Sequence, residues 1–336
     1  MIVSIAMITY NHEKFISKAI SSVLMQRTDF EYELVIGEDC SIDSTRQICG
    51  EYAQKYGEVI KLLPSETNLG MIPNFIRTLR ACKGKYIAFC EGDDYWTNPL
   101  KLQKQVDFLE ANPDYGLIHT DFYKFHQNIQ KYELSSVLEI RDIGDKLDYD
   151  SLLIENYIQT LTVCLRRDIL IDNLDVIIPN DRTWYLGDYQ IWLYFALFSK
   201  IKYLPEKMAV YRMLEESASY RKDRNRGLQA LVGIYEVRNY FIERYGCKNE
   251  TRETLKNNFI NDTIHLKINV GYDLKDYEFI KEGLIEKETN NIPVTFLDKM
   301  KLFSTTSNLI WKASRVMYYI YKKSMRFSHK YIKYIP

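Results

Sequence analysis

The sequence predicts an α/β fold with a mainly parallel, Rossmann-like sheet that carries helices on both faces. Four short apolar runs, rich in β-branched residues, have the profile of strands buried on both faces; they cover residues 2–9, 33–37, 59–63 and 86–90. Each run is followed by a stretch in which apolar residues recur at helical spacing. Strand and helix repeated four times in this order predict parallel strands joined by crossover helices.

The helices between these strands are expected to begin after polar turns, near Phe15, Ser44, Gly70 and Asn98. In the last of them Asn98 is expected as the N-cap and Pro99 as the first helical residue, because proline is favoured at that position. Beyond about residue 219 the patterns are helical, over 228–242, 251–268 and 277–287.

Composition narrows the class of protein. Of the 336 residues, 46% are hydrophobic and 27% are charged, so the chain can bury a sizeable core. The 45 Lys and Arg balance 45 Asp and Glu, so no global charge would draw the protein to nucleic acid. The six cysteines form no C-x-x-C pair, which favours reduced thiols and a cytoplasmic protein. We expect neither a signal peptide nor a membrane-spanning helix.

Charge is unevenly distributed along the chain. Residues 299–336 contain nine Lys or Arg and no Asp or Glu, whereas residues 1–298 contain 36 basic and 45 acidic residues. Apolar and aromatic residues such as Trp311 and Tyr318 are interleaved with these cations, a pattern typical of a helix lying on an anionic membrane. A helix packed on the acidic body is the alternative. We therefore expect three parts: a sheet domain over 1–220, a helical extension over 221–298 and a basic amphipathic tail over 299–336.

Polar side chains follow three of the predicted strands where each strand ends, in Thr9-Tyr10-Asn11, Glu38-Asp39 and Glu91-Gly92-Asp93-Asp94. Because open parallel sheets bind ligands at the carboxyl ends of their strands, as many as five carboxylates are expected together at one edge. Such crowding is unfavourable unless a cation offsets it, and carboxylate oxygens favour Mg²⁺ or Mn²⁺. Neither G-x-G-x-x-G nor G-x-x-x-x-G-K-[ST] follows the first strand, which excludes dinucleotide-binding and P-loop proteins. The pattern favours a nucleoside diphosphate whose charge a divalent metal holds.

In these stretches the sequence resembles the inverting family 2 glycosyltransferases of the GT-A fold. The matching segments lie in the family's order and spacing within roughly residues 1–220, at 3–26, 33–45, 68–70, 84–99, 159–167, 187–193 and 211–212. The resemblance implies a GT-A catalytic domain over 1–220. It also implies transfer of a sugar, expected to come from a UDP-sugar, to an acceptor hydroxyl with inversion. The expected product is a surface polysaccharide or glycolipid made at the cytoplasmic face of the membrane.

The resemblance also implies roles for individual residues. Asp39 matches the carboxylate that reads the base, where uracil N3–H offers a donor to a charged acceptor. Asp188 matches the base that deprotonates the acceptor hydroxyl. Glu91, Asp93 and Asp94 match the DxD-type motif, in which one carboxylate contacts the ribose and its neighbour ligates a metal bridging the two phosphates. The uracil and ribose pocket is expected to be lined by Thr9, Tyr10, Asn11 and Glu13.

One position departs from the family's pattern. The family often carries a metal-binding His two positions after its Tyr-Arg pair, and here Tyr211-Arg212 leads to Leu214 instead. Either water fills that coordination position or the metal is held less tightly. Arg212 is expected to compensate by pairing with a diphosphate oxygen.

Each assignment has a structural alternative. Asp39 and Asp43 are also typical helix caps, and Asp188 is an ordinary residue for a first helical turn. The Asp93-Asp94 pair also suits a solvated turn. Three tryptophans suit either the core or a sugar-stacking surface: Trp96, Trp184 and Trp192. For the whole chain the alternative is a non-catalytic protein of the same fold that binds a partner glycosyltransferase.

Overall fold

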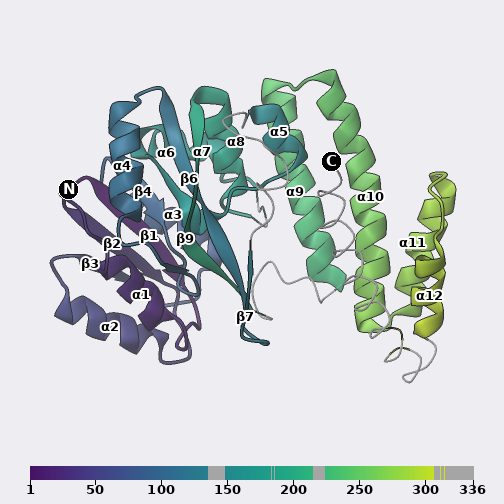
Figure 1. Ribbon diagram of the computed structural model, residues 1–336, viewed down its shortest axis with the longest axis horizontal. Helices are drawn as coiled ribbons and strands as arrows, with labels where there is room; N and C mark the ends of the chain where they lie inside the picture. The colour runs from purple at the N-terminus through teal and green to yellow at the C-terminus, as the bar shows by residue number, and fades with distance from the viewer. Residues whose placement is uncertain are drawn as a thin grey trace, which may run out of the picture. The chain divides into compact units, whose positions relative to one another are not determined.

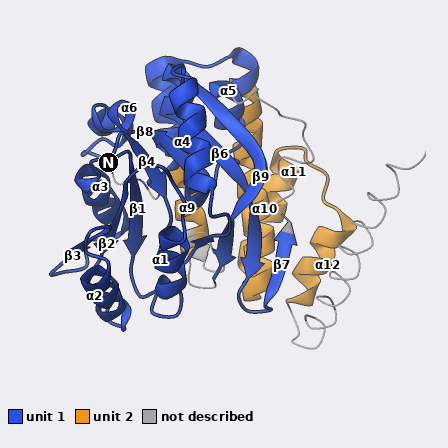
Figure 2. Cartoon of the chain, turned by 60° about the vertical axis from the view of Figure 1, so that its left-hand side comes forward, with its two compact units in different colours: residues 1–217, 236–251 blue, residues 218–235, 252–336 orange. Residues whose placement is uncertain are grey.

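The computed structural model describes residues 1–134, 148–182, 184, 186–214, 224–305, 311 and 314. The chain divides into two compact units, which Figure 2 distinguishes by colour. Unit 1 comprises residues 1–217 and 236–251, and unit 2 comprises residues 218–235 and 252–336. Helix α9 (Arg224–Tyr245) therefore contributes to both units. The expected separation of residues 221–298 from residues 299–336 stays a prediction.

Unit 1 is built on a β-sheet (Figure 1). Among the described residues this sheet has nine strands, in the order β3-β2-β1-β4-β8-β6-β9-β5 with β7 paired to β6. The first four strands of this order are parallel neighbours. They are β1 (Val3–Thr9), β2 (Tyr32–Glu38), β3 (Ile60–Pro64) and β4 (Tyr86–Phe89). The four predicted strands and the α/β fold class are thus confirmed.

The other half of the sheet is mixed, a feature that the repeated strand–helix pattern does not predict. β8 (Val163–Arg166) runs antiparallel to both β4 and β6 (Tyr115–His126), and β9 (Lys200–Met213) runs parallel to β6. β5 (Tyr95–Trp96) and β7 (Lys131–Leu134) add short antiparallel pairings. The short β5 brings the acidic segment that follows β4 against β9.

Helices cover both faces of the parallel half. α1 (Ile16–Leu24), α2 (Thr45–Lys55) and α4 (Lys101–Ala111) share one core with alternate residues of the strands, such as Ile5 and Met7 of β1. α3 (Met71–Ala81) lies on the opposite face, where Phe75 stacks on Phe89 at 5.9 Å between ring centroids. A Cβ at Gly37 of β2 would lie only 2.0 Å from Thr78 Oγ1, so glycine permits this close approach of α3.

The start of α4 differs from the prediction. The helix begins at Lys101 and not at Pro99. Asn98 Oδ1 accepts the N–H of Leu100 at 2.9 Å, so its side chain stabilises the turn that precedes the helix.

The remaining helices of unit 1 are α5 (Tyr149–Ile154), the short 3₁₀ helix η1 (Thr160–Thr162), α6 (Arg167–Ile171), α7 (Leu174–Ile177) and α8 (Tyr189–Phe198). The second half of α9 is fastened to them. Arg238 donates to Ile154 O at 2.9 Å and to Tyr189 Oη at 3.2 Å, and Tyr240 Oη donates to Val176 O at 2.9 Å.

Unit 2 is helical and has its own core. α10 (Asn249–Leu274) and α11 (Tyr277–Thr289) bury Ile264, Ile268, Tyr272, Ile280 and Leu284 together. α12 (Phe296–Ser304) follows a capping box formed by Thr295 and Asp298. No helix among the described residues is long and apolar enough to cross a membrane.

Trp311, expected at a membrane interface, is a packing residue of unit 2. Its ring lies against the core that contains Tyr272, and its Nε1 donates to Tyr272 O at 2.8 Å. Ser314 Oγ lies 2.7 Å from Tyr272 Oη. This part of the tail therefore follows the packed alternative, and residues 315–336 lie outside the described residues.

Candidate active site

The carboxyl ends of β1, β2 and β4 lie side by side, as expected. Thr9 of β1 pairs with Glu38 of β2, and the N–H of Asp39 donates to Thr9 O at 3.1 Å. On the other side of β1, the N–H of Gly92 donates to Ile8 O at 3.0 Å. The loops that follow these three strands therefore meet at one edge of the sheet.

Gly92 packs tightly against the end of β1. A Cβ atom at this position would lie 2.6 Å from Thr9 Oγ1 and 2.8 Å from His12 Nδ1. Real Cβ atoms essentially never approach other atoms this closely. Glycine therefore lets the acidic segment run directly beside the loop after β1.

The loop after β1 is fastened to the loop after β2. Asn11 adopts a positive φ of 56°, and its Oδ1 accepts the N–H of Ile42 at 3.0 Å. Glu13 Oε2 accepts the N–H of Ser44 at 3.1 Å. Tyr10 is 39% exposed. Of the four residues expected to line a nucleoside pocket, Tyr10 thus offers its ring to solvent, Asn11 and Glu13 shape the loop, and Thr9 is buried.

Asp39 is buried, and both of its carboxylate oxygens are hydrogen bonded. Oδ1 accepts the N–H of Leu69 at 2.9 Å and Oδ2 accepts the N–H of Gly70 at 3.0 Å, so Asp39 fastens the start of α3. The start of α2 is held instead by Asp43, whose Oδ1 accepts the N–H of Thr45 at 2.9 Å. Each oxygen of a carboxylate has two lone pairs, so Asp39 keeps the capacity to accept a further donor.

Glu91, Asp93 and Asp94 place three carboxyl groups in the turn between β4 and β5. Asp94 is only 2% exposed, which does not fit the alternative of a solvated turn. Burial raises the pKa of Asp94 well above its usual range, and the negative charges of Asp93 and Glu91 raise it further. Burial and the charges of Asp93 and Asp188 likewise raise the pKa of Glu91. The turn therefore gathers carboxyl groups whose ionisation is disfavoured unless a cation is near.

Arg212 of β9 is the cation beside this turn. Its main-chain N–H donates to Asp94 Oδ1 at 2.7 Å, and its Nε donates to Asp93 O at 2.7 Å. Its Nη1 donates to Gln127 Oε1 at 2.6 Å. The guanidinium also lies over the ring of Phe15 at 4.7 Å. These contacts fix Arg212 as a support for the acidic turn, a role in addition to the expected one toward a diphosphate.

Asp188 lies immediately before α8. Its Oδ2 accepts a hydrogen bond from Thr160 Oγ1 at 2.6 Å. Burial raises the pKa of Asp188, and the hydrogen bond from Thr160 opposes that rise. Because the charge of Asp188 also raises the pKa of Glu91, the two carboxyl groups lie within electrostatic reach of each other. A carboxylate with a raised pKa beside an acidic turn is suited to accept a proton.

The chemistry of the acidic turn fits a divalent cation bound together with phosphate oxygens. Crowded carboxyl groups with raised pKa values are stabilised by a cation, and Mg²⁺ is commonly held by one or two carboxylates plus substrate phosphates. The described part of the chain contains no ready-made group of three His, Cys, Asp or Glu side chains for a metal. Leu214, at the family's His position, is partly buried directly after β9.

No sequence pattern predicted a role for Thr160, and none decided whether the tryptophans lie in the core or at a sugar-stacking surface. The segment 159–167 resembled the family, but nothing in it indicated that a threonine would contact a carboxylate 28 positions later. The tryptophans belong to the core, because Trp96, Trp184 and Trp192 are all at most 5% exposed.

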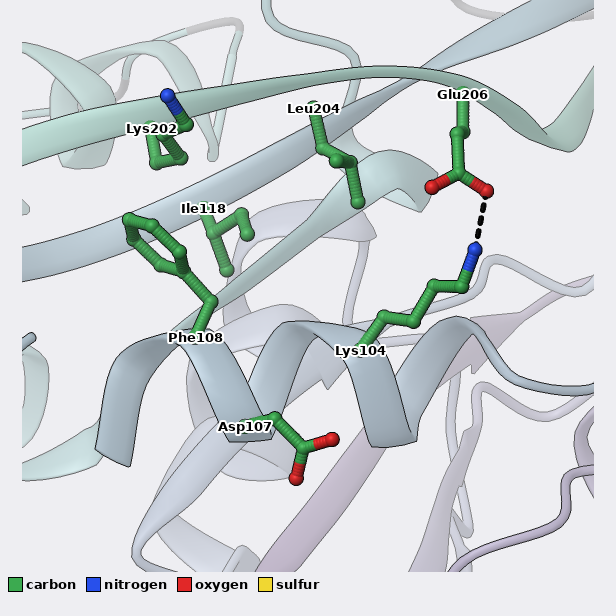
Figure 3. Close-up of a pocket in the computed structure, with 7 residues that line it drawn as sticks. All are labelled: Lys104, Asp107, Phe108, Ile118, Lys202, Leu204 and Glu206. Atoms are coloured by element: carbon green, nitrogen blue, oxygen red, sulfur yellow. Dashed lines mark hydrogen bonds and ion pairs between the residues drawn. The ribbon is translucent and has the colours of Figure 1, made fainter. Parts of the chain in front are cut away.

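A separate cavity of about 290 Å³ lies between α4 and the strands β6 and β9 (Figure 3). Phe108, Ile118 and Leu204 give it an apolar lining, and an ion pair of 2.5 Å between Lys104 and Glu206 crosses one side. None of the candidate site residues lines it; the other lining residues are Asp107 and Lys202.

The family model described as Glycosyl transferase family 2 matches residues 4–174, which is half of the chain. The chain therefore belongs to this family. It is similar to an uncharacterized protein of Mycobacterium bovis, with 39% identity over 211 residues. That alignment covers 62% of this chain and 58% of the relative, so less than two thirds of the relative's length is matched. TuaG of Bacillus subtilis, whose name refers to teichuronic acid biosynthesis, is 29% identical over 66% of this chain and 82% of its own.

Two solved structures share the fold at low identity. TarS 1-349 of S. aureus, in complex with UDP-GlcNAc, gives a TM-score of 0.51 at 18% identity and covers 88% of this chain and 93% of its own. The mannosyltransferase PcManGT of Pyrobaculum calidifontis, in complex with GDP-Man and Mn²⁺, gives 0.53 at 14% identity over 96% of this chain and 86% of its own. With the family match, these similarities identify the fold as GT-A.

Proposed function

We propose that this protein transfers a sugar from a nucleoside diphosphate sugar to an acceptor hydroxyl with inversion, with Asp188 as the base. The observation that carries the proposal is the hydrogen-bonded, partly buried carboxyl of Asp188 within electrostatic reach of the acidic turn at 91–94. In one step, the acceptor oxygen attacks the anomeric carbon, its proton passes to Asp188, and the diphosphate leaves from the opposite side.

The donor is proposed to be a UDP-sugar that lies along the edge formed by the loops after β1, β2 and β4. Tyr10 and Thr9 would border the nucleoside, and Asp39 would accept a base N–H while it continues to hold Leu69 and Gly70. The complexes of TarS with UDP-GlcNAc and of PcManGT with GDP-Man support a nucleotide-sugar donor in this fold.

The diphosphate is proposed to lie beside Glu91, Asp93 and Asp94, with Mg²⁺ or Mn²⁺. When bound, the ion would neutralise charge that develops on the departing diphosphate. The Mn²⁺ in the PcManGT complex supports the use of a divalent ion. Arg212 would keep the turn in place and add positive charge.

The acceptor is proposed to belong to a cell-surface polysaccharide or glycolipid, a proposal that the name of TuaG supports. We further propose that the protein is cytoplasmic and lies on the inner, anionic face of the membrane. The six Lys and Arg after Ser314 support this placement, as does Phe296, which is 82% exposed at the start of α12.

The test is release of nucleoside diphosphate from a panel of UDP- and GDP-sugars, with Mn²⁺ and candidate acceptors, by the wild type and Asp188→Asn. Asn keeps the shape of Asp but accepts no proton, so kcat should fall by about 10²–10⁴ while donor binding survives. Asp175→Asn, at an exposed ion pair with Arg80, is the matched control and should keep wild-type kcat.

Two outcomes would contradict the proposal. Asp188→Asn with more than a tenth of wild-type kcat would exclude Asp188 as the base. A wild type that binds donors but releases no more diphosphate than Asp188→Asn would favour the non-catalytic alternative.

A further inference from the structure

The buried turn η1 contacts the candidate base directly. Thr160, its first residue, is 7% exposed and donates its hydroxyl to Asp188 Oδ2 at 2.6 Å. A hydrogen bond from a hydroxyl to a carboxylate is short and strong compared with neutral pairs. The terminal torsion of an aspartate is otherwise broad, so this bond restricts how the carboxyl group rotates.

Two buried side chains hold the main chain of η1. Trp96 Nε1 donates to Leu161 O at 2.9 Å, and Gln105 Nε2 donates to Thr162 O at 2.9 Å. Each of the three residues of η1 is thus engaged, one through its side chain and two through their carbonyl oxygens. The position of the Thr160 hydroxyl is set by residues from β5 and α4.

Lys101 fixes the orientation of Gln105. Its ammonium, which is fully buried, donates to Gln105 Oε1 at 2.8 Å and lies 4.2 Å from the centre of the Trp96 ring. An ammonium group only donates, so it requires the amide oxygen of Gln105 and turns the NH₂ group toward η1. The same lysine therefore contacts both side chains that hold the turn.

Trp96 also belongs to the segment that carries the acidic turn. It lies two residues after Asp94 in β5 and pairs with Ala209 of β9. The stretch 91–96 thus presents the carboxylates proposed to face the diphosphate and also holds the turn that contacts Asp188. The hydrogen bonds from Thr160 to Asp188 and from Trp96 to Leu161, together with the main chain between their residues, connect the two proposed halves of the reaction site.

We propose that Thr160 is a positioning residue that orients the carboxyl group of Asp188 toward the acceptor hydroxyl, with η1 and Trp96 setting its distance from the acidic turn. The inference rests on the proposed function of Asp188. During transfer the acceptor proton moves to Asp188, while Thr160 keeps its own proton and only donates the hydrogen bond.

The test compares Thr160→Val, which keeps the shape and removes the donor, with Thr160→Ser, which keeps the donor. Thr160→Val should lower kcat by about 10–100-fold, the effect expected for one hydrogen bond to a charged group. The donor KM and the affinity for UDP should stay within about two-fold of wild type. Thr160→Ser should restore most of kcat. Thr160→Ala, which adds no atom to the site, gives the same comparison if Val prevents folding.

Thr162→Val is the matched control, because Thr162 is also buried and its hydroxyl donates within the turn, to Gln159 O at 2.6 Å, and not to Asp188. It should keep kcat near wild type. In the Asp188→Asn background, Thr160→Val should cause no further fall, since Thr160 acts through Asp188.

The outcomes separate this inference from the proposed function. An active Asp188→Asn variant would overturn the base assignment itself. If Asp188→Asn is inactive but Thr160→Val and Thr160→Ala keep wild-type kcat, only the role of Thr160 is overturned. An equal loss in Thr162→Val would assign the effect to folding of the turn and would also overturn it.

Discussion

The main-chain N–H of Arg212 donates to Asp94 Oδ1 at 2.7 Å, and the side chain of the same arginine donates to the carbonyl oxygen of Asp93. One residue of β9 thus holds both the backbone and a carboxylate of the acidic turn. The conformation of the acidic turn therefore depends on contacts from strand β9, far along the chain, as well as on its own sequence.

Arg212→Lys should weaken both the fold and nucleotide binding. Lysine keeps the charge, but its single nitrogen cannot reach Asp93 O and Gln127 Oε1 in the geometry of a guanidinium. The free energy of unfolding should fall by about 1–3 kcal/mol, measured by urea denaturation. UDP affinity should fall by about ten-fold, measured by calorimetry. Arg80→Lys, at an exposed ion pair, should change neither quantity appreciably. Wild-type stability and UDP affinity in Arg212→Lys would contradict the proposed support of the acidic turn by Arg212.

Removal of divalent metal should weaken UDP binding. The carboxyl groups at 91–94 repel a diphosphate unless a cation lies between them, so affinity should be at least about ten-fold lower in EDTA than in Mn²⁺ or Mg²⁺. Calorimetry in the two buffers measures the difference. Asp93→Asn should reduce the dependence on metal, and equal affinities for the wild type with and without metal would rule out a bridging ion.

Leu214→His tests the position at which the family often has a metal ligand. If its side chain faces the ion, an imidazole there should tighten Mn²⁺ binding in the presence of UDP at pH 7.5, where it is largely unprotonated. Met213→His is the matched control, because adjacent residues at the end of a strand point to opposite sides. A folded Leu214→His variant without any gain in affinity would mean that this position faces away from the metal.

Lys101 should make the free energy of unfolding depend on pH in the alkaline range. Burial lowers the pKa of Lys101 to about 8, from an ordinary value of 10.5. Between these values the unfolded chain binds more protons than the folded one, so stability rises with pH. Relative to Lys101→Met, the wild type should gain up to about 3 kcal/mol from pH 8 to 10.5 in urea denaturation. For Lys281→Met, at an exposed position, the difference in unfolding free energy from the wild type should not change with pH. If the difference between the wild type and Lys101→Met is the same at pH 8 and pH 10.5, the burial of Lys101 is contradicted.

The end of the chain should carry the proposed affinity for anionic membranes. Because Trp311 and Ser314 pack within unit 2, the informative truncation ends at Ser314 and removes six Lys or Arg. Full-length protein should cosediment with phosphatidylserine liposomes at low salt and be released as salt rises. The truncated chain, and a full-length chain with those six residues changed to Gln, should stay in solution with unchanged UDP affinity. Liposome binding by both variants would show that the tail is not the anchor.

The parallel half of the sheet was predictable because its signals are local. Buried strands such as β1 and β4 are short apolar runs, and the polar residues after the parallel strands mark the edge at which the loops that carry Asp39 and Asp94 lie. The mixed half was not predictable, because β6 buries His119, Thr120 and Asp121 and so lacks a simple apolar pattern.

The contacts of the site residues were also beyond sequence reasoning, because they join distant segments. No residue near Asp39 in the sequence indicates that its carboxylate accepts hydrogen bonds from the main-chain N–H groups of Leu69 and Gly70. The hydrogen bond from Thr160 to Asp188 likewise depends on how η1 packs against Trp96 of β5. Both contacts arise from tertiary packing, which local propensity and periodicity do not encode.

The close approach of Gly92 to Thr9 couples the acidic turn to the loop after β1. A side chain at position 92 would have to displace Thr9 and His12, whose Oγ1 and Nδ1 atoms lie 2.6 and 2.8 Å from the place of its Cβ. A change of residue 92 is thus also a change of the loop that is proposed to border the nucleoside.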